Sequence, residues 1–323
     1  MKKVGIIGGS GYTGGELIRL VLIHPELELN FVYSSTKSGI SLTNVHQDLL
    51  GRTNLNFTSN VNLDVDILYL CLGHGNSISF LKENVFNDKT LIIDLGNDFR
   101  LKNNQEFEGK KFIYGLPELK RKSIKKSNAI ANPGCFATAV QLALLPLAKT
   151  QNLDSDVHVN ATTGSTGAGV RLGPTSHFSW RNNNLSWYKP FNHQHLGEIN
   201  QSLANLGSKA KIHFLPHRGN FTRGIFATAY IEFNGSLKQV ENLYKDFYQD
   251  HPFTHISSEP LNLKSVINSN NCFLHLHKHE DILLITSILD NLIKGASGQA
   301  IQNTNIIMGW DEKLGLELKA STF

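Results

Sequence analysis

Short apolar runs alternate with segments of helical spacing in the first part of the chain. The apolar runs cover residues 4–7, 27–33, 65–72 and 90–95, and Ser or Gly follows each of them. Between the first two runs, Leu17, Leu20 and Val21 recur at helical spacing. Apolar strands that alternate with helices are typical of a parallel sheet covered on both faces. The pattern therefore predicts an α/β domain with a doubly wound parallel sheet over residues 1–134.

The remainder of the chain has longer runs of strand-like pattern. They cover residues 157–163, 211–215, 224–233 and 281–289. Two stretches, 164–169 and 180–195, are rich in Gly or in Asn and aromatic residues, and we expect them to form loops. We predict a second, α+β domain over residues 135–294, built on a mainly antiparallel sheet that carries helices.

A glycine-rich segment separates the first apolar run from the first helical segment. Its sequence, Gly8-Gly-Ser-Gly-Tyr-Thr-Gly14, fits G-x-x-G-x-x-G, a looser form of the dinucleotide-binding fingerprint. Glycines let the backbone approach a pyrophosphate, whose charge meets the N–H groups at the start of the next helix. A glycine-rich turn without a ligand would look similar, but the strand-turn-helix context favours a Rossmann-type cofactor site. The predicted cofactor ligands here are Gly8, Ser10, Gly11, Tyr12, Thr13 and Gly14.

The end of the second apolar run indicates which dinucleotide binds. An NAD site usually places an acidic residue there for the ribose 2′-hydroxyl, whereas an NADP site omits it. The sequence is Tyr33-Ser-Ser-Thr-Lys-Ser38, which contains no acid. Ser35 and Lys37 could bind a 2′-phosphate, although a solvated polar turn would have the same composition. We therefore predict NADP.

Composition narrows the class of protein. The length of 323 residues suits two domains, and the 40 % hydrophobic and 18 % charged fractions are in the globular range. The net charge of +4 is too diffuse for a nucleic-acid footprint but suits anionic small molecules. No stretch approaches the ~18 apolar residues of a membrane span. We expect a cytoplasmic protein with a small-molecule substrate, without nucleic-acid or membrane partners.

The three cysteines differ in their surroundings. Their number and spacing suit neither a disulfide framework nor a zinc ribbon, which favours reduced thiols. Cys135 follows Asn132-Pro-Gly134, a tight turn, and residues 135–149 are predicted to form a helix. A helix N-terminus stabilises a thiolate, which is the nucleophilic form. A small buried residue that packs a helix start is the alternative, and it is our interpretation of Cys71 and Cys272.

Several blocks of sequence together resemble one family. They are Gly11-Tyr-Thr-Gly14, Gly73-His-Gly75, Asp98-Phe-Arg-Leu101, Tyr114-Gly-Leu-Pro-Glu-Leu119, Asn132-Pro-Gly-Cys135, Pro216-His217, Thr222-Arg-Gly224, Asp290-Asn-Leu292 and Lys294-Gly-Ala-Ser-Gly-Gln299 with Asn303. In this order they resemble the N-acetyl-gamma-glutamyl-phosphate reductases, which are similar to the aspartate-semialdehyde dehydrogenases. The resemblance spans nearly the whole chain.

The resemblance implies an enzyme of arginine biosynthesis. Cys135 would be the nucleophile that forms a thioester with loss of phosphate, NADPH would reduce this thioester to the semialdehyde, and His217 would be the general acid/base. The same chemistry on aspartyl phosphate or N-acyl-aminoadipyl phosphate remains an alternative, because one methylene of chain length leaves little trace in a sequence. A nucleotide-binding sensor without turnover is a further alternative, which the combination of Cys135 and His217 disfavours.

The resemblance also implies further site residues. Arg100 and Arg223 are candidates for the substrate carboxylate or phosphate, with ordinary salt bridges as the alternative. The other expected substrate ligands are Asn132, Ser165 and His193, and the other expected cofactor ligands are His74, Gly167 and Asn303. The match at Asn303 implies that a C-terminal helical segment, 295–323, joins the first domain. The family suggests a homodimer or homotetramer.

The chain departs from the family pattern at two places. Arg218-Gly-Asn-Phe221 stands where the family usually has Leu-Val-Pro-Met, and Gly197 stands where Pro is usual. The altered pocket could admit another N-acyl group, such as succinyl instead of acetyl.

A cluster of alternating histidines could suggest a metal site. His275, His277 and His279 would share one face of a strand, a spacing that can ligate zinc. Because Lys278 is adjacent and no cysteine cluster accompanies them, we interpret them as a solvated strand face and predict no metal.

Overall fold

The computed structural model describes residues 1–73 and 75–322. It forms two compact units: residues 1–133 with 296–317, and residues 134–295 with 318–322. His74, one of the expected cofactor ligands, lies outside the described residues.

The first unit is a doubly wound α/β layer structure. Its main sheet has the order β2-β1-β3-β4-β8-β7, and every pairing in it is parallel. The strands are β1 (Lys2–Ile7), β2 (Leu27–Tyr33), β3 (Ile67–Leu70), β4 (Leu91–Asp94), β7 (Ile113–Tyr114) and β8 (Ala129–Ala131), with a separate hairpin of β5 (Glu106–Phe107) and β6 (Lys110–Lys111). The helices are α1 (Tyr12–Ile23), α2 (Ser77–Glu83), α3 (Pro117–Ile124) and α8 (Gly298–Met308). The α/β prediction is confirmed.

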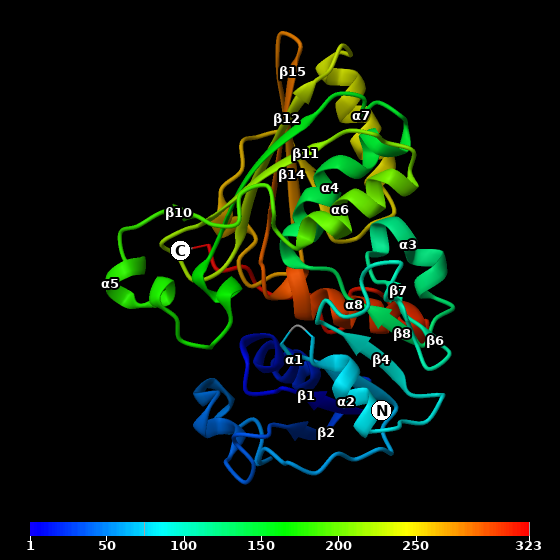
Figure 1. The fold of residues 1–323 in the computed structure, drawn as a ribbon, viewed down its shortest axis with the longest axis vertical. Coiled ribbons are helices and arrows are strands. Elements are labelled where there is room, and N and C mark those ends of the chain that lie inside the picture. The colour runs from blue at the N-terminus through cyan, green and yellow to red at the C-terminus, as the bar shows by residue number, and fades with distance from the viewer. Residues whose placement is uncertain (74, 323) are drawn as a thin grey trace. The chain divides into compact units, whose positions relative to one another are not determined.

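Helix α8 completes the first unit from the far end of the chain. Figure 1 shows its red ribbon against elements of the first unit, and buried side-chain bonds hold it there. The Tyr69 hydroxyl bonds Thr304 at 2.6 Å, and His24 Nε2 bonds Asn305 Oδ1 at 3.0 Å. The helical segment is shorter than predicted, because Gly309 ends α8 with a left-handed φ of 73°. Residues 318–322 belong to the second unit.

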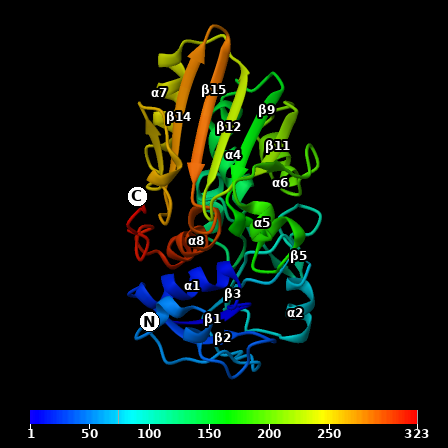
Figure 2. The ribbon, with the colours of Figure 1, turned by 90° about the vertical axis from the view of Figure 1, so that its left-hand side faces the viewer.

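The second unit is a seven-stranded sheet with helices on one face. The order is β10-β11-β9-β12-β15-β14-β13. The strands are β9 (Val157–Thr163), β10 (Ser186–Trp187), β11 (Ile212–Arg218), β12 (Ile225–Glu232), β13 (Thr254–Ser257), β14 (Cys272–His279) and β15 (Ile282–Leu289). The helices are α4 (Cys135–Lys149), α5 (Phe178–Arg181), α6 (His195–Asn205) and α7 (Leu237–Tyr248), and Figures 1 and 2 show α4, α6 and α7 on the same side of the sheet.

The sheet of the second unit is mixed. Four pairings are antiparallel, but β11 pairs with β9, and β13 with β14, in parallel. On β14, the side chains of Cys272, Leu274 and Leu276 are buried, and the alternate histidines lie on the more exposed face. Successive side chains of a strand point to opposite faces, which explains why the first set is buried and the histidines are more exposed.

Three local expectations are corrected. Helix α1 begins at Tyr12 and so includes the last residues of the glycine-rich segment, which the sequence pattern assigned to a turn. The stretch 180–195 is not a single loop, because it contains the end of α5, strand β10 and the first residue of α6. The stretch 164–169 contains a 3-10 turn, Ser165–Ala168. In each case the segment is rich in polar and small residues, so hydrophobic periodicity does not reveal its regular structure.

Candidate active site

In the first unit, the turn between β1 and α1 has the shape of an anion-binding loop. Gly8 has a φ of 81°, and its N–H donates to the carbonyl of Tyr33 at 3.0 Å. A Cβ at Gly8 would lie 2.5 Å from the carbonyl oxygen of Cys71, so no side chain fits there. Gly11 caps α1 without a side-chain hydrogen bond, and the first turn of the helix presents its N–H groups.

The end of β2 lies beside this turn. Ser10 Oγ and Ser34 Oγ are 3.2 Å apart, which places the start of the predicted 2′-phosphate segment next to the glycine loop. Ser35 and Lys37 are exposed and therefore accessible to a ligand.

Asn303 on α8 links three parts of the first unit. Its Nδ2 donates to the carbonyl of Gly115 at 2.8 Å and to Oδ1 of Asn132 at 3.1 Å. Its own Oδ1 is buried and has no hydrogen-bond partner in the described part of the chain. A buried amide oxygen without a donor is expensive, which fits a site where a ligand N–H completes the bond.

Arg100 supports the main chain that leads to Cys135. This buried guanidinium donates through Nε to the carbonyl of Asn132 and through Nη2 to the carbonyl of Leu95, each at 2.9 Å. Asn132 is itself buried and donates to the carbonyl of Ala296 at 3.0 Å. These contacts give Arg100 a supporting position in the turn.

Asp94, at the carboxyl end of β4, is a titratable group that the sequence analysis missed. Its Oδ1 accepts from Ser77 Oγ at 2.6 Å and from the N–H of Gly96 at 3.0 Å, and Oδ2 has no hydrogen-bond partner among the described residues. Burial raises the pKa of Asp94 to about 6, although these hydrogen bonds oppose the shift. Its position after an apolar strand was the available signal.

In the second unit, Cys135 is the first residue of α4. Gly134 caps the helix without a side-chain hydrogen bond, so the positive end of the helix faces a half-buried thiol. The other two thiols do not begin a helix, although Cys71 is half-buried like Cys135. Burial raises the pKa of Cys71 to about 12, and Cys272 is fully buried beside Ser287.

Two residues of α6 hold the peptide before Cys135. The N–H of Gly134 donates to Glu198 Oε2 at 3.0 Å. The imidazole of His195 lies directly over Gly134, because a Cβ there would be 2.3 Å from Nε2 of His195. Neither His195 nor Glu198 is among the site residues expected from the sequence. The signal was the His193-x-His195 pair followed three residues later by a glutamate.

His193 lies in an aromatic cluster beside the start of α4. Its ring is 5.5 Å from that of Phe136 and 4.6 Å from that of His195, and its Nδ1 accepts from the N–H of His195 at 3.2 Å. His217, the expected acid/base, is half-buried on β11 and pairs with Thr162 and Trp187 in the sheet. Within residues 1–73 and 75–322, no hydrogen bond or ring contact joins His217 to another side chain.

Arg223 is paired within the protein. Its Nε and Nη2 lie 3.0 and 3.2 Å from the two carboxylate oxygens of Asp290, which is fully buried. The nearby 3-10 turn is tied to the same region, since the N–H of Ser165 donates to the carbonyl of Phe221 at 2.8 Å. Gly167 is exposed at the tip of this turn.

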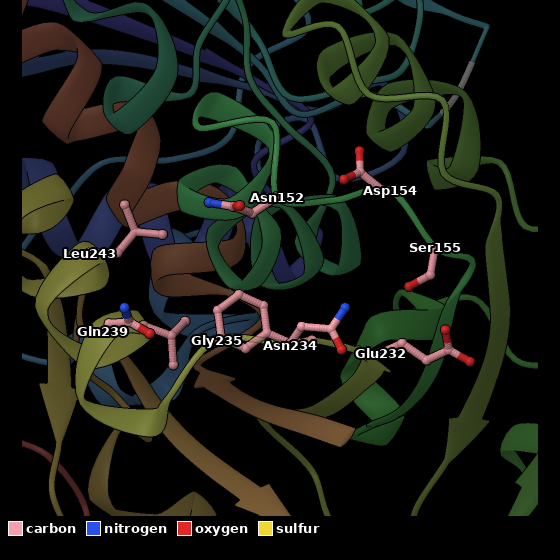
Figure 3. A pocket seen from close by; sticks show the side chains of 10 residues that line it. Asn152, Asp154, Ser155, Glu232, Asn234, Gly235, Gln239 and Leu243 are labelled. Carbon is pink, nitrogen blue, oxygen red and sulfur yellow. The ribbon is translucent and has the colours of Figure 1, made fainter. Parts of the chain in front are cut away.

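A cavity of about 700 Å³ in the second unit involves none of these residues. Figure 3 shows its lining from the segment after α4, the end of β12 and α7, with Asp154, Glu232 and Gln239 among the side chains. Within the described residues, no group of three or more His, Cys, Asp or Glu side chains is arranged to hold a metal ion. None of the helices described is both long and apolar enough for a membrane span.

Comparisons with known proteins agree with this geometry. Residues 3–127 match a family described as semialdehyde dehydrogenase, NAD binding domain, and residues 135–291 match semialdehyde dehydrogenase, dimerisation domain. Over 100 % of both chains, the protein is 58 % identical to the N-acetyl-gamma-glutamyl-phosphate reductase of Flavobacterium johnsoniae and 52 % identical to that of Parabacteroides distasonis. The chain belongs to the N-acetyl-gamma-glutamyl-phosphate reductase family.

Solved structures show the same fold at low sequence identity. Aspartate semialdehyde dehydrogenase II of Vibrio cholerae, complexed with ASA, has a TM-score of 0.72 at 13 % identity, over 96 % of this chain and 98 % of that one. The enzyme with NADP from Candida albicans has a TM-score of 0.68 at 12 % identity, over 95 % and 99 %. The chain thus has the two-unit architecture expected for the reductase family. The match to the NAD binding domain indicates a nicotinamide cofactor.

Proposed function

We propose that the protein catalyses NADPH-dependent reductive dephosphorylation of an N-acyl-glutamyl 5-phosphate in arginine biosynthesis. The products are the N-acyl-glutamate 5-semialdehyde and phosphate. The observation that carries the proposal is the half-buried thiol of Cys135 at the first residue of α4. The names of the close relatives support the substrate class.

The chain's own residues account for the bond changes at sulfur. Cys135 Sγ bonds to the acyl carbon while the bond from that carbon to the phosphate oxygen breaks, which gives a thioester and free phosphate. The bound cofactor supplies the hydride that reduces this thioester. The C–S bond then breaks, the aldehyde leaves and the thiol is restored. The N-terminal dipole of α4 stabilises the sulfur whenever it carries negative charge.

An acid/base must accept the thiol proton and return it when the C–S bond breaks. The resemblance assigns this role to His217, whereas the position of His195 over Gly134 makes it a second candidate. We propose to separate them with His217→Asn and His195→Asn. Loss of kcat together with loss of the pH dependence of kcat in one variant identifies the acid/base, while a variant that loses activity but keeps the profile has a positioning role.

The residues of the first unit fit NADP. We propose that the loop from Gly8 to Gly14 and the start of α1 hold the pyrophosphate, and that Ser35 and Lys37 hold the 2′-phosphate. The orphaned Oδ1 of Asn303 would accept from the carboxamide of the nicotinamide. Tyr12 and Thr13, in the first turn of α1, contribute main-chain N–H groups.

The remaining ligand assignments are proposals of unequal support. Asn132, Ser165, His193 and Gly167 lie on segments tied to the start of α4 or to the Thr222-Arg223 turn. Arg100 already donates hydrogen bonds to main-chain carbonyls, and Arg223 donates to the carboxylate of Asp290.

The matched dimerisation domain supports a homo-oligomer built through the second unit. We propose a homodimer in the cytoplasm, where NADPH and phosphorylated intermediates occur. Light scattering during size-exclusion chromatography measures this directly, and a mass of one 35.9 kDa chain would contradict it.

One assay tests the proposed reaction in reverse. Purified protein receives N-acetyl- or N-succinyl-glutamate semialdehyde with NADP, with and without inorganic phosphate. We expect reduction of NADP only with phosphate, and none with Cys135→Ser. Reduction that does not need phosphate, or full activity of the serine variant, would contradict the thioester route.

A further inference from the structure

A buried histidine contacts the glycine loop of the first unit. Nε2 of His46 lies 2.8 Å from the carbonyl oxygen of Gly9. Because a carbonyl oxygen only accepts hydrogen bonds, Nε2 carries a proton and donates it. His46 is 8 % exposed, and a Cβ on Gly15 would lie 2.5 Å from its Cε1. The ring therefore packs closely on the start of α1 as well as on the loop.

The segment that carries His46 is fastened to the first unit by other contacts. It contains two 3-10 turns, Leu42–Asn44 and Gln47–Leu49, each with a buried leucine. Asp48 accepts two hydrogen bonds from Arg19 of α1, at 2.6 and 2.7 Å. The position of the imidazole is thus set independently of its own bond to the loop.

The imidazole of His46 is neutral at physiological pH. Burial lowers its pKa and the charge of Arg19 acts in the same direction, whereas the bond to Gly9 and the carboxylates of Asp48 and Glu16 oppose the shift. A neutral ring has one N–H, which here is the one that bonds the loop. The bond therefore holds the loop without placing a charge beside it.

The main-chain N–H groups of the loop differ in their acceptors. Those of Gly8 and Gly9 donate to the carbonyl of Tyr33 at 3.0 and 3.2 Å, and that of Gly11 donates to the carbonyl of Gly8 at 3.2 Å. Among the described residues, the N–H of Ser10 has no acceptor. A main-chain N–H needs a partner, so this group remains for a ligand or water.

The bond from His46 determines the direction of that N–H. The carbonyl of Gly9 and the N–H of Ser10 belong to one trans peptide, in which they point in opposite directions. With the carbonyl held by the imidazole, the N–H is directed to the opposite side of the loop. Glycine has the widest range of backbone torsions, so the residue itself does little to fix this peptide. The histidine bond selects its orientation.

Resting on the proposed function, we propose that His46 is a positioning residue for the cofactor. Its bond to Gly9 directs the N–H of Ser10 at the pyrophosphate of the dinucleotide, where a charged oxygen accepts a stronger hydrogen bond than a neutral one. Without the imidazole the peptide turns among several orientations, and binding has to select the one that donates. The expected cost is about tenfold in affinity, the lower end for a hydrogen bond to a charged group.

The test measures the Kd of NADP, NAD and adenosine 2′-monophosphate by isothermal titration calorimetry. His46→Leu removes the donor and keeps an apolar side chain. We expect it to raise the Kd of both dinucleotides about tenfold, because they share the pyrophosphate. The Kd of adenosine 2′-monophosphate, which has no pyrophosphate, should stay within about twofold, and kcat at saturating NADP within about threefold.

Three further variants make the result specific. His46→Gln keeps an amide N–H at about the reach of Nε2 and should restore most of the affinity, whereas His46→Asn, one methylene shorter, should lose as much as His46→Leu. This pair decides the point even if the leucine variant does not fold. Thr53→Ala removes the bond from the N–H of Leu55 to Thr53 Oγ1, at 3.2 Å in the stretch after the turns, and should change none of the three constants.

The outcomes separate this inference from the function beneath it. An unchanged Kd for NADP in His46→Leu, an equal loss for adenosine 2′-monophosphate, or equal losses in the Gln and Asn variants would each overturn the role of His46 and leave the cofactor site intact. A wild type that binds neither dinucleotide would contradict the proposed function, and this inference would fail with it.

Discussion

The starts of α1 and α4 are built alike and surrounded differently. Each follows the carboxyl end of a parallel strand, and each has a glycine cap, Gly11 or Gly134, without a side-chain hydrogen bond. Around Gly11 the nearest atom to an added Cβ would be 3.6 Å away, whereas at Gly134 the ring of His195 would be 2.3 Å away. An open helix start suits an anion that comes and goes. A crowded one suits an anion that belongs to the chain, the thiolate of Cys135.

The reactivity of the thiols is the most sensitive test of this comparison. With a pKa of about 12, Cys71 is almost entirely protonated at pH 7.5, and Cys272 is fully buried. We expect iodoacetamide to alkylate Cys135 on the order of a thousandfold faster than Cys71. Peptide mass spectrometry at a series of times measures both rates, and comparable labelling of the two thiols would remove the distinction.

Gly134→Ala tests the crowding at α4. The new methyl group must displace the imidazole of His195, so we expect kcat to fall by roughly 10²-fold. Gly173→Ala is the control in the same unit, since its methyl group would lie 3.8 Å from the nearest atom, Ser176 Oγ, and kcat should stay within about threefold. Steady-state rates of both variants decide the point. An unchanged kcat in Gly134→Ala would show that the position of His195 does not matter for turnover.

The titration of Asp94 can be tested through the pH dependence of the free energy of unfolding. The folded state holds its carboxyl more readily in the neutral form, because the pKa rises from 3.8 to about 6. The ionised form therefore destabilises the fold above the unfolded pKa, and this cost grows as pH rises from about 4 to 6. Relative to the wild type, Asp94→Asn should gain up to about 3 kcal/mol of unfolding free energy across that window and nothing more above it. Urea titrations at pH 4, 5, 6 and 7 measure the difference, and a flat difference would contradict the assignment.

Lys37→Ala has the smallest expected effect. Removing one exposed cation from a 2′-phosphate site should raise the KM for NADP by about tenfold and leave that for NAD unchanged. Lys89→Ala, at another exposed lysine of the first unit, is the control. Equal changes for the two dinucleotides would show that Lys37 does not read the 2′-phosphate.

The sequence predicts an element well where the residues that define it are contiguous. The strand before Gly8, the helix after it and the helix that begins at Cys135 all depend on neighbours in sequence, and the structure confirms them. The glycine spacing also predicted the turn between β1 and α1, although α1 begins earlier than its apolar pattern suggested.

Contacts between distant segments could not be predicted in this way. Glu198 is 64 residues from Gly134 along the chain, and Asp290 is 67 residues from Arg223. Periodicity gives the face of a helix or strand but not the element that packs against it. Local patterns therefore select Cys135 and a general type of partner, but they do not place His195 over Gly134.

The assignment of α8 to the first unit has a consequence for biosynthesis. Tyr69 and His24 find their partners, Thr304 and Asn305, near the end of the chain. Residues 134–295 are continuous, so most of the second unit can fold as it leaves the ribosome, while the first unit waits for α8. The domain that is synthesised first is thus completed last, and a truncation before Gly298 exposes apolar surface at the opposite end of the sequence.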